Sequence, residues 1–167
     1  MAHRAVKTLV LLGVVGLAAC TNNERFGDSY NYGAGGAGAG DAGNPNSPAY
    51  FQAAVGDRVL FPVDQSTLTA EARSTLDAQA AWMNTHTLYN AQSVGPADEQ
   101  GTREYNLALG ARRANSVQEY LISRGIAGTR LNTVSYGKER PLEICSEEAC
   151  YTKNRRAVTI LQAAAGS

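Results

Sequence analysis

The chain has 167 residues with 15 basic and 15 acidic side chains, so its formal net charge is zero. Binding to the phosphates of nucleic acid needs a surplus of lysine and arginine, and the balanced charge therefore argues against nucleic acid as a main partner. The length allows about one domain once the ends of the chain are set aside. Recognition of a single charged group remains compatible with this balance.

Residues 1–19 have the layout of a signal peptide. Two basic residues, Arg4 and Lys7, precede an uncharged stretch from Thr8 to Ala19. That stretch is shorter than the roughly 20 apolar residues that cross a bilayer as a helix. Its length is typical of the apolar core of a secretory leader.

The leader ends on the residues LAAC at 17–20, which resemble the lipobox of bacterial lipoproteins. The resemblance implies that Cys20 becomes the new N-terminus and carries lipid. Two or more acyl chains hold a protein stably at a membrane without a spanning helix. Thr21 stands where aspartate signals retention in the inner membrane of enterobacteria, so the resemblance implies the outer membrane.

Residues 20–50 are predicted to be a flexible tether behind the lipid. Seven of the chain's 17 glycines fall between Gly27 and Gly43, and Pro45 and Pro48 follow them. Thirty residues of this kind have a root-mean-square span of roughly 30 Å and stretch to about 100 Å. The alternative is a leader remnant with no spacing role.

Residues 51–167 are predicted to form one domain in which strands alternate with helices. Such alternation implies crossover connections and a sheet covered by helices. Pro62 interrupts the first strand, because proline cannot donate to a ladder of backbone hydrogen bonds. The predicted strands are 58–63, 88–94, 131–136 and 156–161, the predicted helices are 69–85 and 102–124, and a turn or short helix is predicted at 146–153.

Residues 95–117, GPADEQGTREYNLALGARRANSV, resemble the signature of the OmpA-like peptidoglycan-binding domain. TVSYGKERP at 133–141 and KNRRAV at 153–158 are similar to the peptidoglycan-associated lipoproteins of that family. The resemblance extends over about 59–162. It implies an α+β fold, a β-α-β-α-β sandwich with one mixed sheet and helices packed on it. The implied ligand is the diaminopimelate side chain of the cell-wall peptide, with no cofactor.

Asp98 and Arg113 are the main candidates for the ligand site. The end group of diaminopimelate carries an ammonium and a carboxylate on one carbon, so a receptor needs an anion facing a two-pronged donor. The guanidinium of arginine meets a carboxylate with two parallel hydrogen bonds. The alternative is an ordinary surface ion pair, or two unrelated solvated charges.

The resemblance also assigns roles to three other residues. It implies that Asn106 braces the binding loop, that Leu109 is the apolar neighbour of the ligand, and that Asp64 is a polar wall. The chain departs from the family's pattern at Pro62, Val63, Pro96 and Gln100. These departures affect the fine shape of the pocket rather than its two charges.

The other cysteines, Cys145 and Cys150, are expected to form a disulfide, because thiols oxidise outside the inner membrane. Closing this short loop would stabilise the fold by about 2 kcal/mol. Two cysteines at this spacing without histidine partners are poor zinc ligands. Mass analysis of the non-reduced mature protein should find no free thiols there.

No catalytic group is expected. The only histidines are His3, in the leader, and His86, at a helix end where a solvated side chain is expected. Neither forms a nucleophile–base pair with an orienting acid. The sequence therefore predicts a lipid-anchored module of the outer membrane, with its domain in the periplasm, that binds peptidoglycan and ties the membrane to the wall.

The resemblance implies TolB and the other Tol proteins as partners, with a role in cell division. Two alternatives stay open. One is an interaction module that binds another envelope protein instead of the wall. The other is a hydrolase that acts on the wall.

Overall fold

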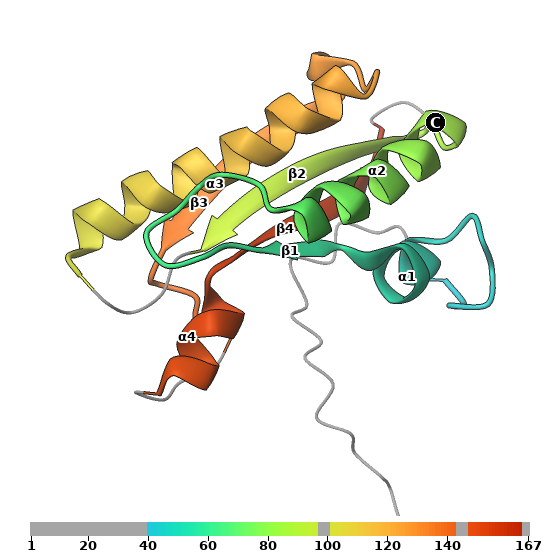
Figure 1. Ribbon diagram of the computed structural model, residues 1–167. Coiled ribbons are helices and arrows are strands. Elements are labelled where there is room, and N and C mark those ends of the chain that lie inside the picture. Colours follow the sequence, from blue (N-terminus) through green and yellow to red (C-terminus); the bar gives the residue numbers. More distant parts are fainter. Residues whose placement is uncertain (1–39, 97–100, 143–146, 165–167) are drawn as a thin grey trace, which may run out of the picture. The chain divides into compact units, whose positions relative to one another are not determined.

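The computed structural model describes residues 40–96, 101–142 and 147–164 (Figure 1). The signal peptide, Cys20, Asp98, Gln100 and Cys145 lie outside the described residues. The elements in chain order are α1 (Pro48–Tyr50), a π-helical turn (Phe51–Gly56), β1 (Arg58–Leu60), α2 (Ala70–Thr85), β2 (Tyr89–Pro96), α3 (Arg103–Ser123), a 3-10 helix (Gly128–Arg130), β3 (Leu131–Gly137), α4 (Glu148–Asn154) and β4 (Arg156–Ala163).

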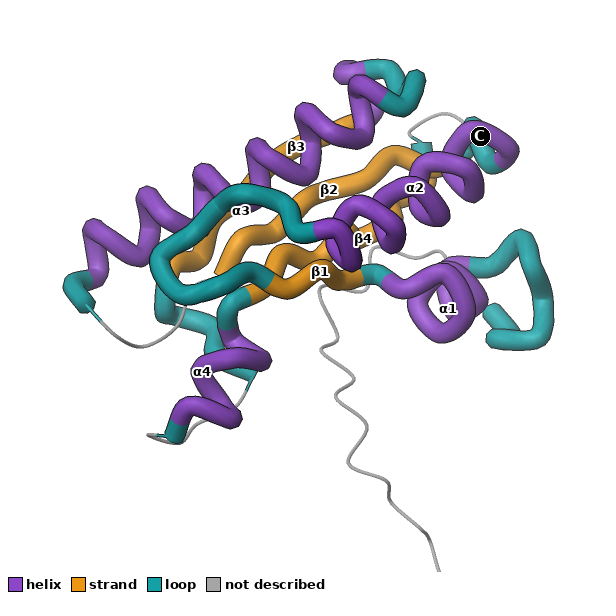
Figure 2. Tube along the Cα trace, viewed as in Figure 1, coloured by secondary structure: helices purple, strands orange, loops and turns teal. Residues whose placement is uncertain are grey.

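The four strands form one mixed sheet in the order β1-β4-β2-β3 (Figure 2). Strand β4 is antiparallel to β1 and to β2, whereas β2 and β3 are parallel. Strands β1, β2 and β3 therefore run in the same direction, and their carboxyl ends lie at one end of the sheet. The loops that leave these three strands are brought together there.

The two long helices, α2 and α3, pack on one face of the sheet (Figure 1). The periodic apolar residues of each helix face inward, and they meet side chains from all four strands in one core. This arrangement confirms the predicted α+β fold with helices on a mixed sheet. Core residues from both layers are Val59, Leu76, Met83, Ala91, Val117, Leu121, Leu131 and Ala157.

Local sequence signals set the helix ends. The hydroxyl of Thr69 accepts a hydrogen bond from the backbone N–H of Ala72, and Thr102 caps α3 in the same way. Helix α3 ends at Ser123 and is followed by Gly125, whose φ of 95° is in the left-handed region that favours glycine. The predicted strand at 58–63 is shorter in the structure: β1 ends at Leu60, because Pro62 has no N–H to continue the ladder.

Helix α3 and strand β2 make contact through two glycines. A Cβ atom added to Gly110 would overlap the carbonyl oxygen of Gly95 and the hydroxyl of Ser135, and one added to Gly95 would overlap the carbonyl of Gly110. The hydroxyl of Ser135 donates to the carbonyl of Leu107 at 2.7 Å. Helix α3 is therefore held against β2 and β3 at the point where both strands end.

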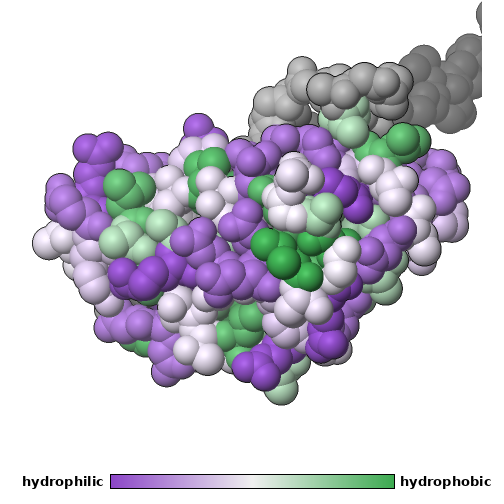
Figure 3. Space-filling model, turned by 90° about the horizontal axis from the view of Figure 1, so that it is seen from above, coloured by the Kyte–Doolittle hydropathy of each residue, from purple (hydrophilic) through white to green (hydrophobic). Residues whose placement is uncertain are grey.

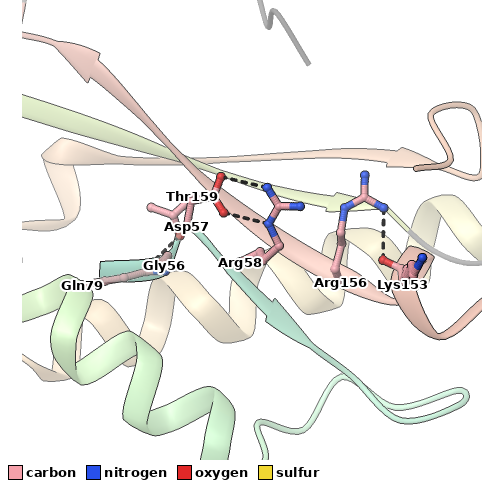
Figure 4. Close-up of polar contacts among 7 residues, drawn as sticks. All are labelled: Gly56, Asp57, Arg58, Gln79, Lys153, Arg156 and Thr159. Carbon is pink, nitrogen blue, oxygen red and sulfur yellow. Dashed lines mark hydrogen bonds and ion pairs between the residues drawn. The ribbon is translucent and has the colours of Figure 1, made fainter. Parts of the chain in front are cut away.

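A buried glutamine links α2 to the sheet (Figure 4). Gln79 is fully buried. Its Nε2 donates to the carbonyl of Gly56 at 2.7 Å, and its Oε1 accepts from the hydroxyl of Thr159 at 2.8 Å. The backbone N–H of Thr159 donates to the carbonyl of Asp57, also at 2.7 Å. One side chain thus joins three separate parts of the chain.

Gln79→Leu is expected to destabilise the domain by about 2–4 kcal/mol, because it leaves the half-buried carbonyl of Gly56 and the buried hydroxyl of Thr159 without their partner. Urea unfolding followed by circular dichroism measures the change. Gln52→Leu is the control: Gln52 is exposed, and its replacement should stay within about 0.5 kcal/mol. Equal stability of both variants would contradict a structural role for Gln79.

The segment before β1 packs onto the end of α2. The indole Nε1 of Trp82 donates to the carbonyl of Pro45 at 2.9 Å. His86, expected to be solvated, is half-buried and stacks on Trp82 with ring centroids 3.8 Å apart. Its Nε2 lies 2.8 Å from Oδ1 of Asn46. Residues 44–50, assigned from sequence to the end of the tether, thus form turns and helix α1 against the domain.

Candidate functional site at the carboxyl ends of the strands

The predicted ligand residues that the structure describes lie where β1, β2 and β3 end and α3 begins. Asp64 is on the loop after β1, and Asn106, Leu109 and Arg113 are on the first half of α3. Asp98 lies outside the described residues, in the loop that joins β2 to α3. The Asp98–Arg113 pair therefore stays a prediction.

Arg113 is fully buried. Its Nε donates to the carbonyl of Gln65 at 2.9 Å, and one Nη donates to the carbonyl of Pro62 at 3.2 Å. The guanidinium carbon lies 5.2 Å from the ring centroid of Phe61. The loop after β1 is thus wrapped around a fixed positive charge. The sequence predicts that Arg113 binds the ligand. In the structure its guanidinium donates to the loop after β1, and ligand binding by Arg113 stays a prediction.

Asp64 is exposed and has a φ of 55°, which is unusual for a residue with a side chain. Its Oδ1 accepts a hydrogen bond from the hydroxyl of Tyr105 at 3.2 Å. This contact ties the loop after β1 to the first turn of α3. Asp64 therefore lies at the rim of the site, where the resemblance placed a polar wall.

Asn106 and Leu109 are both buried. Nδ2 of Asn106 donates to the carbonyl of Thr102 at 3.0 Å. This bond braces the residue that caps α3, next to the loop that carries Asp98. Leu109, expected to touch the ligand, is 1% exposed and contributes to the packing beneath the site.

The end of β3 and the residue after it contact the start of α3. Nζ of Lys138 donates to the carbonyl of Gly101 at 3.2 Å. Gly137 has a φ of 53° and packs on the backbone of Asn106 and Leu107, where a Cβ would come within 3.0 Å of the Leu107 nitrogen. These two contacts were not predicted, because they join residues distant in sequence.

Helix α4 adds an ion pair at this end of the sheet. The buried guanidinium of Arg155 donates to the exposed carboxylate of Glu148. The backbone carbonyl of Arg155 accepts a hydrogen bond from the N–H of Phe61 at 2.8 Å. The hydrogen bond from Arg155 holds the pKa of Glu148 below its usual value. Cys150 lies on α4; its predicted partner Cys145 is outside the described residues, so the pairing stays a prediction.

A hollow of about 450 Å³ lies between the start of α3 and the end of β3, beside the predicted ligand residues and not among them. Sequence analysis missed it. The helical spacing of Leu107 with Val117 and Leu121 predicts that it is buried, whereas the structure leaves it half-exposed beside the hollow. The hollow is lined by Arg103, Glu104, Leu107, Ser135, Tyr136, Gly137 and Glu139.

Two further features of the described residues bear on function. They contain no group of three or more His, Cys, Asp or Glu side chains placed to hold a metal ion. No helix among them is both long and apolar enough to cross a membrane.

Comparison with known proteins identifies the fold and its relatives. Residues 60–155 match the OmpA family. The chain is 44% identical over 156 residues to the peptidoglycan-associated lipoprotein of Mesorhizobium japonicum, covering 93% of this chain and 91% of that protein. The corresponding protein of Rhizobium meliloti is 46% identical over 154 residues, covering 92% and 85%.

Solved structures agree. The crystal structure of the peptidoglycan-associated lipoprotein from Burkholderia pseudomallei matches with a TM-score of 0.64 and 33% identity, over 72% of this chain and 98% of that one. The C-terminal domain of Helicobacter pylori MotB shares the fold, with a TM-score of 0.60, 20% identity, and coverage of 65% and 86%.

A mixed sheet with two helices on one face and loops gathered at the strand ends is thus the OmpA-like domain, and the chain belongs to the OmpA family. Its similar relatives over most of its length are the peptidoglycan-associated lipoproteins, or Pal. The resemblance inferred from residues 95–117 is confirmed.

Proposed function

We propose that this protein is a lipoprotein of the outer membrane that binds peptidoglycan through the diaminopimelate side chain and ties the membrane to the cell wall. Lipid on Cys20 anchors it, residues before the packed segment at 44–50 act as the tether, and the domain lies in the periplasm. Partnership with TolB and other Tol proteins during cell division belongs to the same proposal. So does a disulfide between Cys145 and Cys150.

The observation that carries the proposal is the position of Arg113. Its guanidinium is held by backbone carbonyls of the loop after β1, at the end of the sheet where the Asp98 loop also leaves β2. Arginine fixed in this way supplies a preorganised positive charge, and charge-assisted hydrogen bonds to a carboxylate are the strong ones. The names of the relatives support the same ligand class.

Asp98 completes the site in this proposal. It would accept the ammonium of the diaminopimelate end group while Arg113 faces the carboxylate. The contacts of Asn106 and Lys138 with Thr102 and Gly101 fix the start of α3, to which the Asp98 loop is joined. Specificity then comes from the distance between two opposite charges and needs no net charge on the domain.

Asp98→Asn tests the proposal because it removes the charge and keeps the shape. We expect co-sedimentation with purified peptidoglycan to fall at least tenfold, since a charged hydrogen bond contributes about 1.5–3 kcal/mol. Glu119→Gln is the matched control, because Glu119 is exposed in the second half of α3. Equal pelleting of both variants would remove Asp98 from the site, and release of soluble wall fragments would favour a hydrolase.

A further inference from the structure

The turn after β1 has a strained backbone at the rim of the proposed site. Within the described residues, Asp64 is the only residue other than glycine with a positive φ, at 55°. The N–H of Gln65 donates to the carbonyl of Pro62 at 3.2 Å, which closes a turn with Asp64 at its third position. We propose that Tyr105 is a positioning residue for wall binding, because its hydroxyl holds the carboxylate of Asp64 in place on this turn. The inference rests on the proposed function and adds a residue to it.

Two contacts hold this turn. Glycine usually occupies the third position of a turn with positive φ, and a residue with a side chain persists there only where its surroundings hold it. The buried guanidinium of Arg113 fixes the backbone, since it bonds to the carbonyls of Pro62 and Gln65. The hydroxyl of Tyr105 donates to Oδ1 of Asp64 at 3.2 Å. Among the described residues, Tyr105 alone bonds to the Asp64 carboxylate and thereby fixes its direction.

Tyr105 is itself held at the start of α3, although its side chain is 42% exposed. Its backbone N–H donates to Oγ1 of Thr102 at 3.2 Å, as part of the helix cap. Its ring packs near Gly101, where an added Cβ would lie 3.5 Å from the ring carbon Cδ1. Gly101 is at the end of the loop that carries Asp98. Tyr105 therefore connects the turn after β1 to the end of the Asp98 loop.

Positioning of this kind changes affinity through preorganisation. When a binding group occupies several conformations, the apparent affinity falls in proportion to the fraction in the competent one. The face of the domain seen in Figure 3 is mostly hydrophilic, and its hydrophobic residues lie in small separate groups. A surface of this composition binds a polar peptide through well-placed polar groups rather than through apolar area. The hydroxyl of Tyr105 supplies such placement for the carboxylate of Asp64.

Tyr105→Phe tests the inference because it removes the hydroxyl and keeps the ring. The mature lipidated chain in detergent micelles is titrated with purified diaminopimelate-type peptidoglycan, and co-sedimentation gives an apparent dissociation constant. We expect binding to weaken about fivefold, the effect of one lost hydrogen bond, with the urea unfolding midpoint unchanged. Tyr120→Phe is the matched control, because the Tyr120 hydroxyl donates to Asp77 at 3.0 Å in the second half of the same helix. Its wall binding should equal that of the wild type.

A double-mutant cycle shows whether Tyr105 acts through Asp64. Tyr105→Phe should cause no further loss of binding in the Asp64→Ala background. In the Asp64→Asn background it should again weaken binding, because the asparagine oxygen still accepts from the hydroxyl. Wild-type affinity of Tyr105→Phe, or an additive loss with Asp64→Ala, would overturn the inference and leave the proposed function intact. Failure of the wild-type chain to sediment with the wall would overturn both.

Discussion

Gly110→Ala should destabilise the domain by about 3 kcal/mol, the upper end of the range of about 1–3 kcal/mol that is typical when an added group meets rigid neighbours in a packed interior. The added Cβ would overlap the backbone carbonyl of Gly95, which cannot rotate away as a side chain does. Helix α3 would have to move off β2, and its hydrogen bond from Ser135 would be lost with it. The free energy of unfolding in urea, followed by circular dichroism, measures the effect.

Gly128→Ala is the control for this substitution. A Cβ at Gly128 would meet only Cδ1 of Ile122 at 3.5 Å, an ordinary van der Waals contact. Its stability should therefore stay within about 0.5 kcal/mol of the wild type. If Gly110→Ala unfolds at the same urea concentration as this control, α3 does not contact β2 as closely as described.

Arg113→Met should cost about 2–4 kcal/mol of stability and reduce peptidoglycan binding at least tenfold. Methionine keeps the aliphatic bulk but removes the donors that hold the carbonyls of Pro62 and Gln65. The loop after β1 would then lose its fixed shape, and the proposed site would lose its cation. Urea unfolding and co-sedimentation, the latter at a temperature where the variant is folded, measure the two effects separately.

Arg112→Met is the neighbouring control, since Arg112 is exposed on the same turn of α3. It removes the same formal charge and should change neither stability nor wall binding appreciably. Equal loss of binding in both variants would show a nonspecific charge effect. Unchanged stability of Arg113→Met would contradict the role of Arg113 in holding the loop.

Helices and strands followed from local patterns in this chain. The apolar period from Leu68 to Met83, with Thr69 as the cap, predicted a helix at 69–85, and α2 is Ala70–Thr85. Pro62 predicted an interruption of the first strand, and β1 ends before it. The family was reached from residues 95–117, because that segment combines a loop, a cap and a helix face in one continuous stretch.

Features that depend on contacts between distant residues could not be predicted in this way. Arg113 was expected to face a ligand, and only its distance from Pro62 and Gln65 in space shows that it also holds a loop. Helical periodicity placed Leu107 on the buried face, whereas the end of β3 leaves it half-exposed beside a hollow. Local sequence patterns predict which face of a helix or strand is apolar. They do not predict where the neighbouring strand ends, and so which part of that face stays exposed.

The packing of residues 44–50 on Trp82 has a consequence for mechanics under the proposed function. This segment contacts the end of α2 and the start of β2, whereas the candidate site lies where β2 ends. A pull between the lipid and the wall would enter the domain at one end of the strands and leave it at the other. The folded domain would then be in series with the tether, and the Trp82–Pro45 hydrogen bond would carry tension together with the contacts that hold the ligand.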